Sequence, residues 1–381
     1  MKPYRIFTAL LLFLVGLFRL DAGNAPEKEN HAVRLAYDVN FDMNFDNREF
    51  ARSRFTPSMT IFAARLTPTL GLSVSSPDGT LHKVMAGVDV MKDFGSQEKD
   101  VLGEVSLYYK LDKKIGRTGL TMYAGVFPRK TMSDRYSEAF FSDSLRFYDN
   151  NLEGLLLQLR RPSASFEFGC DWYGRYGHGV REKFMLFSSG EGKVAPVLSL
   201  GYALYVCHFA GSKEVKGVVD NILANPYARF DFGHLVGLQT FSVRLGWLQA
   251  MQNDRRNIGI YTFPFGGELE VTVRNWNVSV ENSLFYGKDM MPYYNMCDAG
   301  GYKYGNRLYL GDPFYRVHDD ANNTRGGLYD RLDIMWNPYL CDFVQISVGA
   351  RFHFNDFRYS GCRQIVKVAF NLSELMKIRR K

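Results

Sequence analysis

The most regular feature of the sequence is an alternation of apolar and polar residues close to its start. From Val33 to Phe45 every second residue is apolar, and most of the residues between them are polar or charged. A strict period of two over 14 residues predicts a long β-strand with one apolar and one polar face. Strands of soluble domains usually span about 5–6 residues, whereas a tilted strand that crosses a bilayer needs about 9–11. The length therefore favours a membrane-spanning strand.

The same alternation recurs along the chain, notably at 104–111, 166–173, 241–247, 268–274 and 344–355. Division at turn signals predicts sixteen strands. They lie near 32–46, 57–74, 81–93, 101–112, 117–129, 151–161, 164–176, 180–189, 193–211, 219–233, 238–251, 257–273, 276–288, 326–337, 342–355 and 362–372.

The connections between these strands differ in length according to a simple rule. Short turns follow the even-numbered strands, among them 76–79, 113–116, 162–163 and 190–192. The two longest connections, 130–150 and 289–325, follow odd-numbered strands. Bacterial barrels have an even number of strands, short periplasmic turns and longer outer loops. The pattern therefore predicts an all-β fold, a transmembrane antiparallel β-barrel of about 16 strands with two long outer loops.

The tryptophans fit the same topology. Trp276 and Trp336 lie beside short turns, and Trp172 and Trp247 fall towards the opposite strand ends. Aromatic residues gather at both water–lipid interfaces of membrane barrels. We therefore expect two tryptophans at each interface.

The first residues indicate export. Lys2 and Arg5 precede an unbroken apolar run of 11 residues, 8–18, which is followed by the small residues Ala22 and Gly23. This order is typical of a secretory signal peptide, and the run is shorter than the ~20 residues of a spanning helix. We expect a signal peptide (1–23), a periplasmic N-terminal linker (24–31), the barrel (32–372) and a basic C-terminal tail (373–381), in the cell outer membrane.

The net charge of +7 comes mostly from the two ends of the chain, so the barrel itself is nearly neutral. No basic stripe marks a nucleic-acid surface, and we expect no nucleic-acid partner. The five cysteines lie far apart and show no metal-type spacing, so we expect no metal site and no cofactor. Whether any of them pair is left open.

The last predicted strand carries a family resemblance. Val366, Val368 and Phe370 alternate with Lys367 and Ala369 close to the chain end. This strand resembles the closing strand of Gram-negative outer-membrane β-barrel proteins of the porin-like type, which bears an assembly signal ending in an aromatic residue. Here eleven residues follow Phe370. The resemblance concerns the architecture of the whole chain, and it implies outer-membrane lipid and the barrel assembly machinery as partners.

If the apolar positions of each strand face the lipid, the alternating polar positions face the interior of the barrel. A barrel of sixteen strands has room there for an aqueous channel. Opposed charges there would either orient polar solutes or neutralise one another, and both interpretations stay open. The candidate lumen-lining residues are Arg34, Asp38, Asp42, Glu104, Glu167, Asp171, Arg229, Asp231, Arg244, Glu268, Glu270, Arg274 and Arg351.

The long connection 289–325 is rich in tyrosine, aspartate, asparagine and glycine. In porins such a loop can fold into the lumen, and its rings would then stack on sugars. The alternative is a lid outside the barrel, which we favour because loops of this size are often protective. The candidate solute-binding residues are Tyr293, Tyr294, Tyr302, Tyr304, Tyr309 and Tyr315.

Catalysis finds little support in local motifs. Asp171 and His178 could form a pair, but no short motif supplies the nucleophile that the pair would need. The sequence shows no phosphate-binding glycine motif, CxxC or HExxH. We therefore predict a chain that is not an enzyme, a porin-like channel for passive diffusion of small polar solutes. The alternatives are a surface binding protein or adhesin that uses loops 130–150 and 289–325 on a barrel anchor, and a hydrolase built on the His178 region. Solute, oligomeric state and openness of the lumen stay undetermined.

Overall fold

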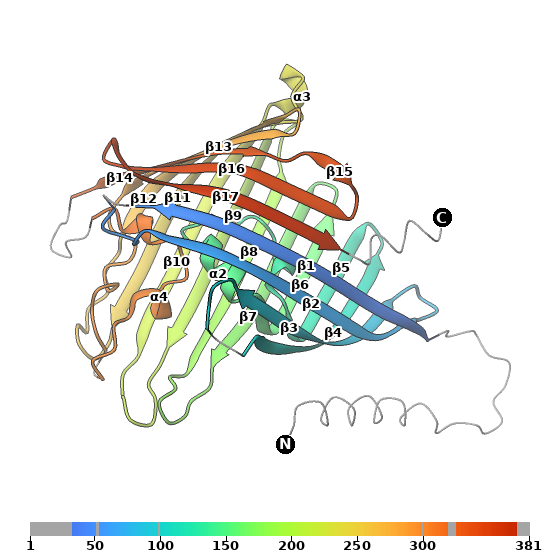
Figure 1. Ribbon diagram of the computed structural model, residues 1–381, viewed down its shortest axis with the longest axis horizontal. Coiled ribbons are helices and arrows are strands. Elements are labelled where there is room, and N and C mark those ends of the chain that lie inside the picture. Colours follow the sequence, from blue (N-terminus) through green and yellow to red (C-terminus); the bar gives the residue numbers. More distant parts are fainter. Residues whose placement is uncertain (1–32, 51–52, 98–99, 299, 319–324, 372–381) are drawn as a thin grey trace.

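Sixteen long antiparallel strands form a closed barrel (Figure 1). The computed structural model describes residues 33–50, 53–97, 100–298, 300–318 and 325–371. Each long strand pairs with its neighbours in the chain, and the first strand closes the barrel against the last. Asn44 lies opposite Ala63 on one side and opposite Lys367 on the other. The predicted all-β antiparallel barrel is confirmed.

The observed strands agree with the predicted ones to within about four residues, except at two strand starts. β9 begins at Leu198 rather than near residue 193, and β12 begins at Phe265 rather than near residue 257. A three-residue strand, β15, pairs with β16 inside the connection that follows β14. The strands are β1 (Arg34–Glu49), β2 (Met59–Ser75), β3 (Leu81–Asp93), β4 (Leu102–Ile115), β5 (Thr118–Pro128), β6 (Asn151–Arg161), β7 (Ala164–Gly174), β8 (Lys183–Lys193), β9 (Leu198–Phe209), β10 (Val219–Asp231), β11 (Thr240–Asp254), β12 (Phe265–Asn275), β13 (Val278–Gly287), β14 (Gly327–Trp336), β15 (Tyr339–Cys341), β16 (Val344–Asn355) and β17 (Arg358–Asn371).

One predicted turn is wrong. Residues 190–192 lie inside β8, and the chain turns at 194–197 instead. A glycine is required at position 190 by packing rather than by a turn, since a Cβ there would lie 2.8 Å from the Tyr202 ring on β9. The glycine makes room for an aromatic neighbour across the strands.

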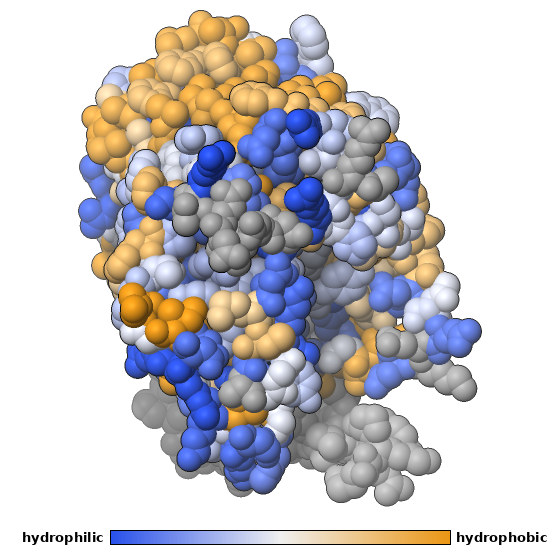
Figure 2. Space-filling view, turned by 90° about the vertical axis from the view of Figure 1, so that its left-hand side faces the viewer, coloured by the Kyte–Doolittle hydropathy of each residue, from blue (hydrophilic) through white to orange (hydrophobic). Residues whose placement is uncertain are grey.

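The outer wall of the barrel is apolar, as the alternation predicts. Leu66, Leu107, Phe168, Leu186 and Val348 are all more than a third exposed, although they lie in the middle of long strands. Figure 2 shows hydrophobic residues along the upper edge of the molecule and hydrophilic ones over much of the face below. A barrel can expose so much apolar surface only where lipid covers it.

The tryptophans occupy the outer surface towards both ends. Trp276 and Trp336 are 86% and 52% exposed at the short turns. Trp172 stacks on Phe184 with ring centroids 4.9 Å apart, near the ends of strands that carry longer connections. We call the two ends of the barrel the short-turn end and the loop end.

The two longest connections fold into the barrel. The first contains the 3₁₀ turn η1 (Arg129–Thr131) and the helix α2 (Asp143–Tyr148); the second contains the helix α4 (Gly305–Leu308) and the 3₁₀ turn η2 (Pro313–Arg316). Together they supply a large part of the buried apolar cluster, in which Phe140, Phe141, Tyr309 and Phe314 are at most 2% exposed. Figure 1 shows α2 and α4 within the outline of the barrel. We call residues 129–150 and 289–318 the plug.

The two segments of the plug are joined to each other. The Ser142 amide donates to the Leu310 carbonyl at 2.9 Å, and the Asp312 amide donates to the Glu138 carbonyl at 2.8 Å. Gly311 permits this approach, since a Cβ there would lie 2.0 Å from the Ala139 carbonyl oxygen. The lid predicted for 289–325 is therefore wrong for residues 289–318, most of whose aromatic side chains are buried inside the barrel.

A short helix, α3 (Gly233–Val236), stands at the short-turn end between β10 and β11. In the described parts of the chain, no helix is long and apolar enough to span a membrane. The expected signal peptide (1–23), linker (24–31) and basic tail (373–381) lie outside the described residues.

Candidate functional site

Predicted lumen-lining residues bind the plug. Glu167 accepts hydrogen bonds from the Ser133 amide at 2.8 Å and from the Tyr136 hydroxyl at 3.1 Å. Asp171 accepts from the Arg129 guanidinium at 3.0 Å. Both carboxylates are 1% exposed. They hold the first plug segment in place rather than face an open channel.

Two arginines on β14 and β16 bind acidic side chains of the first plug segment. Arg351 on β16 pairs with Asp333 at 2.6 Å, with Glu138 at 2.9 Å and with Asp143 at 3.1 Å. Arg331 on β14 binds Glu138 at 2.7 Å. These pairs are buried with good geometry, so loss of one partner would leave an unpaired charge inside the barrel.

Asp143, at the start of α2, lies 3.1 Å from Arg351, 3.6 Å from Arg363 and 4.0 Å from Lys367. Burial alone would raise its pKa, but the charges of Arg351, Lys367 and Arg363 outweigh burial and hold the pKa well below its ordinary value. Asp143 is therefore ionised at neutral pH and attaches the plug to β16 and β17.

The remaining lumen-lining candidates have mixed surroundings. Glu268 accepts from the Tyr315 hydroxyl at 2.7 Å, Arg244 binds Glu270 at 2.7 Å, and Arg274 binds Glu281 at 2.7 Å. Arg229 pairs with Glu191, and two carboxylates accept side-chain hydrogen bonds, Glu104 from Asn151 and Asp38 from Asn40. Asp42 lines a cavity. Arg34 and Asp231 are exposed at the short-turn end.

The candidate solute-binding tyrosines are mostly structural. Tyr293, Tyr304, Tyr309 and Tyr315 are between 1% and 3% exposed, so no sugar ring reaches their faces. Their hydroxyls bind neighbouring groups, as when Tyr309 donates to Gln252 at 2.9 Å. Tyr294 is half-buried and stacks on Tyr309, and Tyr302 is 60% exposed.

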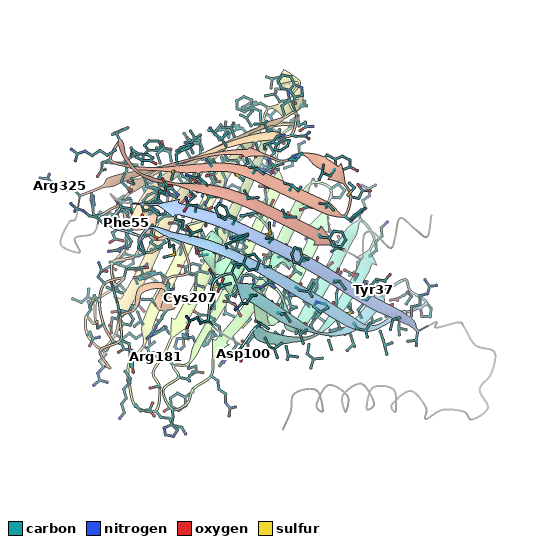
Figure 3. The ribbon with its side chains drawn as sticks, in the orientation of Figure 1. Tyr37, Phe55, Asp100, Arg181, Cys207 and Arg325 are labelled. Atoms are coloured by element: carbon teal, nitrogen blue, oxygen red, sulfur yellow. The ribbon has the colours of Figure 1, made fainter. Side chains whose placement is uncertain are left out.

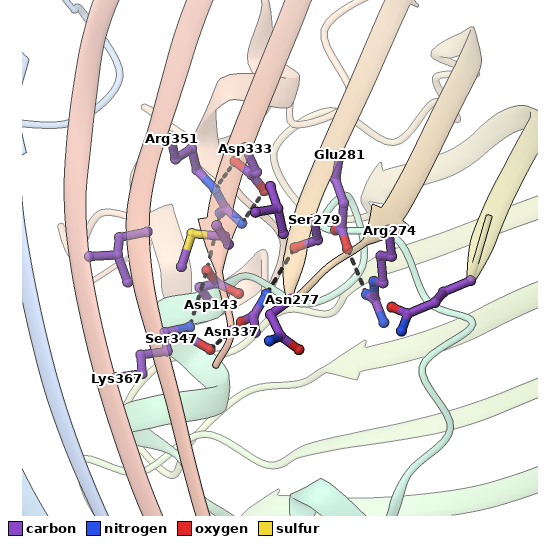
Figure 4. A pocket seen from close by; sticks show the side chains of 14 residues that line it. Asp143, Arg274, Asn277, Ser279, Glu281, Asp333, Asn337, Ser347, Arg351 and Lys367 are labelled. Carbon is purple, nitrogen blue, oxygen red and sulfur yellow. Dashed lines mark hydrogen bonds and ion pairs between the residues drawn. The ribbon is translucent and has the colours of Figure 1, made fainter. Parts of the chain in front are cut away.

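Two polar cavities lie between the plug and the wall towards the short-turn end, with volumes of about 410 and 390 Å³. Asp143, Ser347 and Lys367 line both, so we treat them as one space and call it the vestibule. Figure 4 shows the first cavity, where Asn337 bridges Ser279 and Ser347 and Arg351 binds Asp333.

A third cavity, of about 450 Å³, opens at the loop end. It is lined by the β7–β8 connection (179–181), the β9–β10 connection (212–215) and residues 298–307 of the plug, with Lys183 and Phe209 at its base. We call it the mouth cavity. Figure 3 labels Arg181 in this region.

Beside the mouth cavity, a histidine and a glutamate from two connections form a hydrogen-bonded pair. His178 Nδ1 lies 2.6 Å from Glu214 Oε1. The Gly179 amide and the Ser212 hydroxyl donate to Glu214 Oε2 at 2.8 and 3.1 Å. These hydrogen bonds, led by that of Gly179, lower the pKa of Glu214 to about 2. An ionised Glu214 holds the proton of His178 on Nδ1 and leaves Nε2 free to accept one.

The catalytic pair considered from the sequence is different. Asp171 is buried against Arg129, whereas the His178 side chain is 79% exposed on an outer connection, so the two do not meet. Sequence reasoning missed Glu214, which is 36 residues from His178. The available signal was topological: β8 pairs with β9, and the connections before β8 and after β9 therefore end up side by side.

The mouth cavity has an excess of cations. Arg181 is paired with Asp298 at 2.8 Å. Lys183, Lys303 and Arg307 have no carboxylate within ion-pair distance among the described residues, and each lies over an aromatic ring instead, at 5.2, 5.9 and 5.3 Å. Glu214 also lines the cavity, so its lining has two more cations than carboxylates, and this excess favours an anionic ligand.

Metal-binding arrangements are absent from the described residues, where no group of three or more His, Cys, Asp or Glu side chains could hold an ion. All five cysteines are free.

The closed barrel with an apolar outer wall is that of an outer-membrane β-barrel. A loop L8 deletion mutant of OmpT, an outer membrane protein of Vibrio cholerae, is similar over 89% of this chain and 99% of its own, with a TM-score of 0.54 and 10% sequence identity. A mutant of the Rh. blastica porin is similar over 89% of this chain and 100% of its own, with a TM-score of 0.44 and 11% identity. At such identities the likeness concerns the fold alone.

The chain belongs to the lipid A 3'-O-deacylase-type family, whose model matches residues 27–306. No curated protein matches the sequence. The family is named for an enzyme, so the prediction that the chain is not an enzyme is wrong. The reason is visible in the fold: the groups that could act together are contributed by separate connections, and no local motif reveals them.

Proposed function

We propose that this chain is an outer-membrane hydrolase that removes an ester-linked acyl chain from a phosphorylated glycolipid of the outer leaflet, in keeping with the name of its family. One observation carries the proposal. The His178–Glu214 pair lies beside a cavity that is also lined by three cations without an ion-pair partner among the described residues. A general base next to a site for anions is what hydrolysis of an anionic lipid ester requires.

The chemistry uses water as the nucleophile. His178 Nε2 takes a proton from water while the water oxygen bonds to the ester carbonyl carbon. The tetrahedral intermediate then releases the sugar alkoxide, which takes that proton back from His178. The products are a fatty acid and an alcohol, and Glu214 orients and stabilises the imidazolium that forms in between.

The cations account for binding. Lys183, Lys303 and Arg307 come from β8 and the plug, and their ammonium and guanidinium groups face the same space. Phosphate groups of the substrate would pair with them, and one cation would stabilise the oxyanion of the intermediate.

The position of the site fits a lipid substrate. Trp172 and Phe184 stack on the outer surface close to the ends of the strands that carry His178. Interfacial aromatic residues mark the level of the lipid headgroups. If the short-turn end faces the periplasm, as in other bacterial barrels, the mouth cavity lies at the outer leaflet.

The test is release of fatty acid from purified lipid A by the refolded full-length chain, measured by mass spectrometry. We expect His178→Gln to reduce the rate by about 100-fold or more, the usual contribution of a general base. The matched control is His234→Gln, since His234 is an exposed histidine on α3 at the other end of the barrel. Equal rates for the His178 variant and the unchanged protein would overturn the proposal.

A second candidate function is the solute channel predicted from the sequence. The polar vestibule favours it, and the plug, which fills much of the lumen, opposes it. Conductance in planar bilayers without any fatty-acid release would move the channel to first place. A surface binding protein would show neither activity.

A further inference from the structure

The vestibule contains cations that the proposed hydrolysis does not use. The part with a volume of about 390 Å³ lies between the plug and strands β1, β2 and β17. The plug contributes Lys130 and Arg146, and the wall contributes Lys367 together with Arg48, Arg65 and Arg363. Six cations therefore line one cavity.

Three of these cations form ion pairs with two carboxylates of the wall. Arg48 and Arg363 bind Asp46 at 2.8 and 2.7 Å, and Arg65 binds Asp89 at 3.0 Å. Asp46 and Asp89 are at most 5% exposed, so these pairs belong to the packed interior.

The other three cations are available to a ligand. Lys130 and Arg146 have no carboxylate within 4.0 Å among the described residues, and both are exposed although they lie inside the barrel. Lys367 is 4.0 Å from Asp143 and has a side chain that is 49% exposed. Asp143 offers it little compensation, because Arg351 binds the same oxygen at 3.1 Å.

A neighbouring cavity supports this assignment. It has a volume of about 250 Å³, and Lys130 and Arg146 line it as well. Asp134 also lines it, but it forms no ion pair with either cation in the described residues. The two plug cations thus border a cavity on more than one side. The carboxylates Asp42, Asp46 and Asp143 line the part of about 390 Å³, and Glu281 and Asp333 line the other part of the vestibule.

We propose that the vestibule is a second binding site, for a small multivalent oxyanion of the phosphate type, held between Lys130 and Arg146 on the plug and Lys367 on β17. An anion there gains charge-assisted hydrogen bonds from three cations. It also connects the plug to the wall, so ligand binding stabilises the plugged form by mass action. The site is independent of the mouth cavity and of the hydrolysis proposed there.

The experiment is calorimetric titration of inorganic pyrophosphate into the refolded full-length chain at low salt. All measurements are made in a parent in which Lys183, Lys303 and Arg307 are changed to Gln, so that the mouth cavity does not contribute. We expect saturable binding, and Lys130→Gln/Arg146→Gln/Lys367→Gln should weaken it by about tenfold or more.

The matched control, Lys213→Gln/Lys216→Gln/Lys288→Gln, removes the same charge from exposed outer positions and should change the affinity by less than about twofold. Heat-modified migration on gels confirms folding of each variant, and Lys367→Gln alone should weaken binding if the triple variant does not fold.

Absence of saturable binding in the parent, or equal affinity in the vestibule variant, would overturn the site. Competition by dioleoyl phosphatidic acid vesicles would identify a lipid headgroup as the ligand rather than a soluble phosphate. Absence of fatty-acid release by the unchanged protein, together with pyrophosphate binding by the parent, would overturn the hydrolase and leave this site standing.

Discussion

His178 Nδ1 lies 2.6 Å from Glu214 Oε1, in two connections that the pairing of β8 with β9 brings together at the loop end of the barrel. Glu214 receives two further hydrogen bonds, from the Gly179 amide and the Ser212 hydroxyl, so its position relative to the imidazole is well defined.

The first prediction concerns this pair. Glu214→Gln removes the charge that orients His178 and should lower kcat for lipid A by about 100-fold or more with little change in KM. Lys303→Gln should instead raise KM, because it removes a contact to phosphate. Because the pKa of Glu214 is lowered to about 2, its carboxylate should stay ionised as the pH falls to about 3 and become protonated as the pH falls through about 2. Equal effects of the two variants on kcat would contradict these roles.

The second prediction concerns attachment of the plug. The pKa of Asp143 is depressed in the folded barrel, so its stabilising contribution is present above its unfolded pKa of about 4 and is lost as the pH falls through the folded value. We expect single-channel conductance to rise in acid for the unchanged protein. Asp143→Asn should already show the raised conductance at pH 7. Asp134→Asn, which changes an exposed plug carboxylate that forms no ion pair among the described residues, should not. Identical conductance of the Asn variant and the unchanged protein at both pH values would refute the attachment.

The third prediction concerns the contact between the plug segments. Gly311→Val places a side chain where the Ala139 carbonyl lies, so the segments must separate. We expect a lower Tm and faster tryptic cleavage within 129–150, while the barrel keeps its heat-modified migration. Gly267→Ala is the control, because a Cβ at Gly267 meets no atom within 4 Å. Cleavage as slow as in the control would show that the segments do not depend on this approach.

The fourth prediction concerns the lipid-facing wall. Val348 is 37% exposed on the outer face, and its neighbour Ser347 lines the vestibule. Val348→Arg should therefore cost about 2–4 kcal/mol in the free energy of unfolding from bilayers. Ser347→Arg should cost less, since its charge reaches water. Equal loss of stability in the two variants would contradict the assignment of Val348 to the outer face and Ser347 to the inner face.

The fifth prediction concerns orientation in the membrane. In a background whose five cysteines are changed to serine, Lys303→Cys should react with an impermeant reagent in intact cells. Asp78→Cys, in the short turn between β2 and β3, should react only after permeabilisation. Surface labelling at position 78 would reverse the orientation and place the mouth cavity in the periplasm.

Much of the architecture follows from the sequence alone. The alternation from Val33 to Phe45 determines β1 and its two faces, because the period of a strand is a local property of the backbone. Because every strand reverses direction, alternate connections lie at the same end of the barrel. The lengths of the connections then distinguish the short-turn end from the loop end. Even the strand limits at 81–93 and 151–161 agree with the structure.

The interior is decided by tertiary structure. Tyr309 binds Gln252 across 57 residues, and Gly311 meets Ala139 from the other plug segment. A loop composition rich in tyrosine and aspartate is equally compatible with a lid and with a plug, since the sequence does not state which surface will bury the rings. Only the closed wall supplies partners such as Glu268 and Arg351, which satisfy the polar groups that burial would otherwise leave unpaired.

The same holds for the candidate site. His178 is conspicuous in the sequence, but its partner is not the nearby Asp171, because successive inward positions on β7 direct Asp171 into the barrel towards Arg129. Glu214 becomes its neighbour only when β8 and β9 pair and both connections emerge at the same end. Strand periodicity is encoded locally and can be read from the chain, whereas a site assembled from three connections exists only once the barrel has closed.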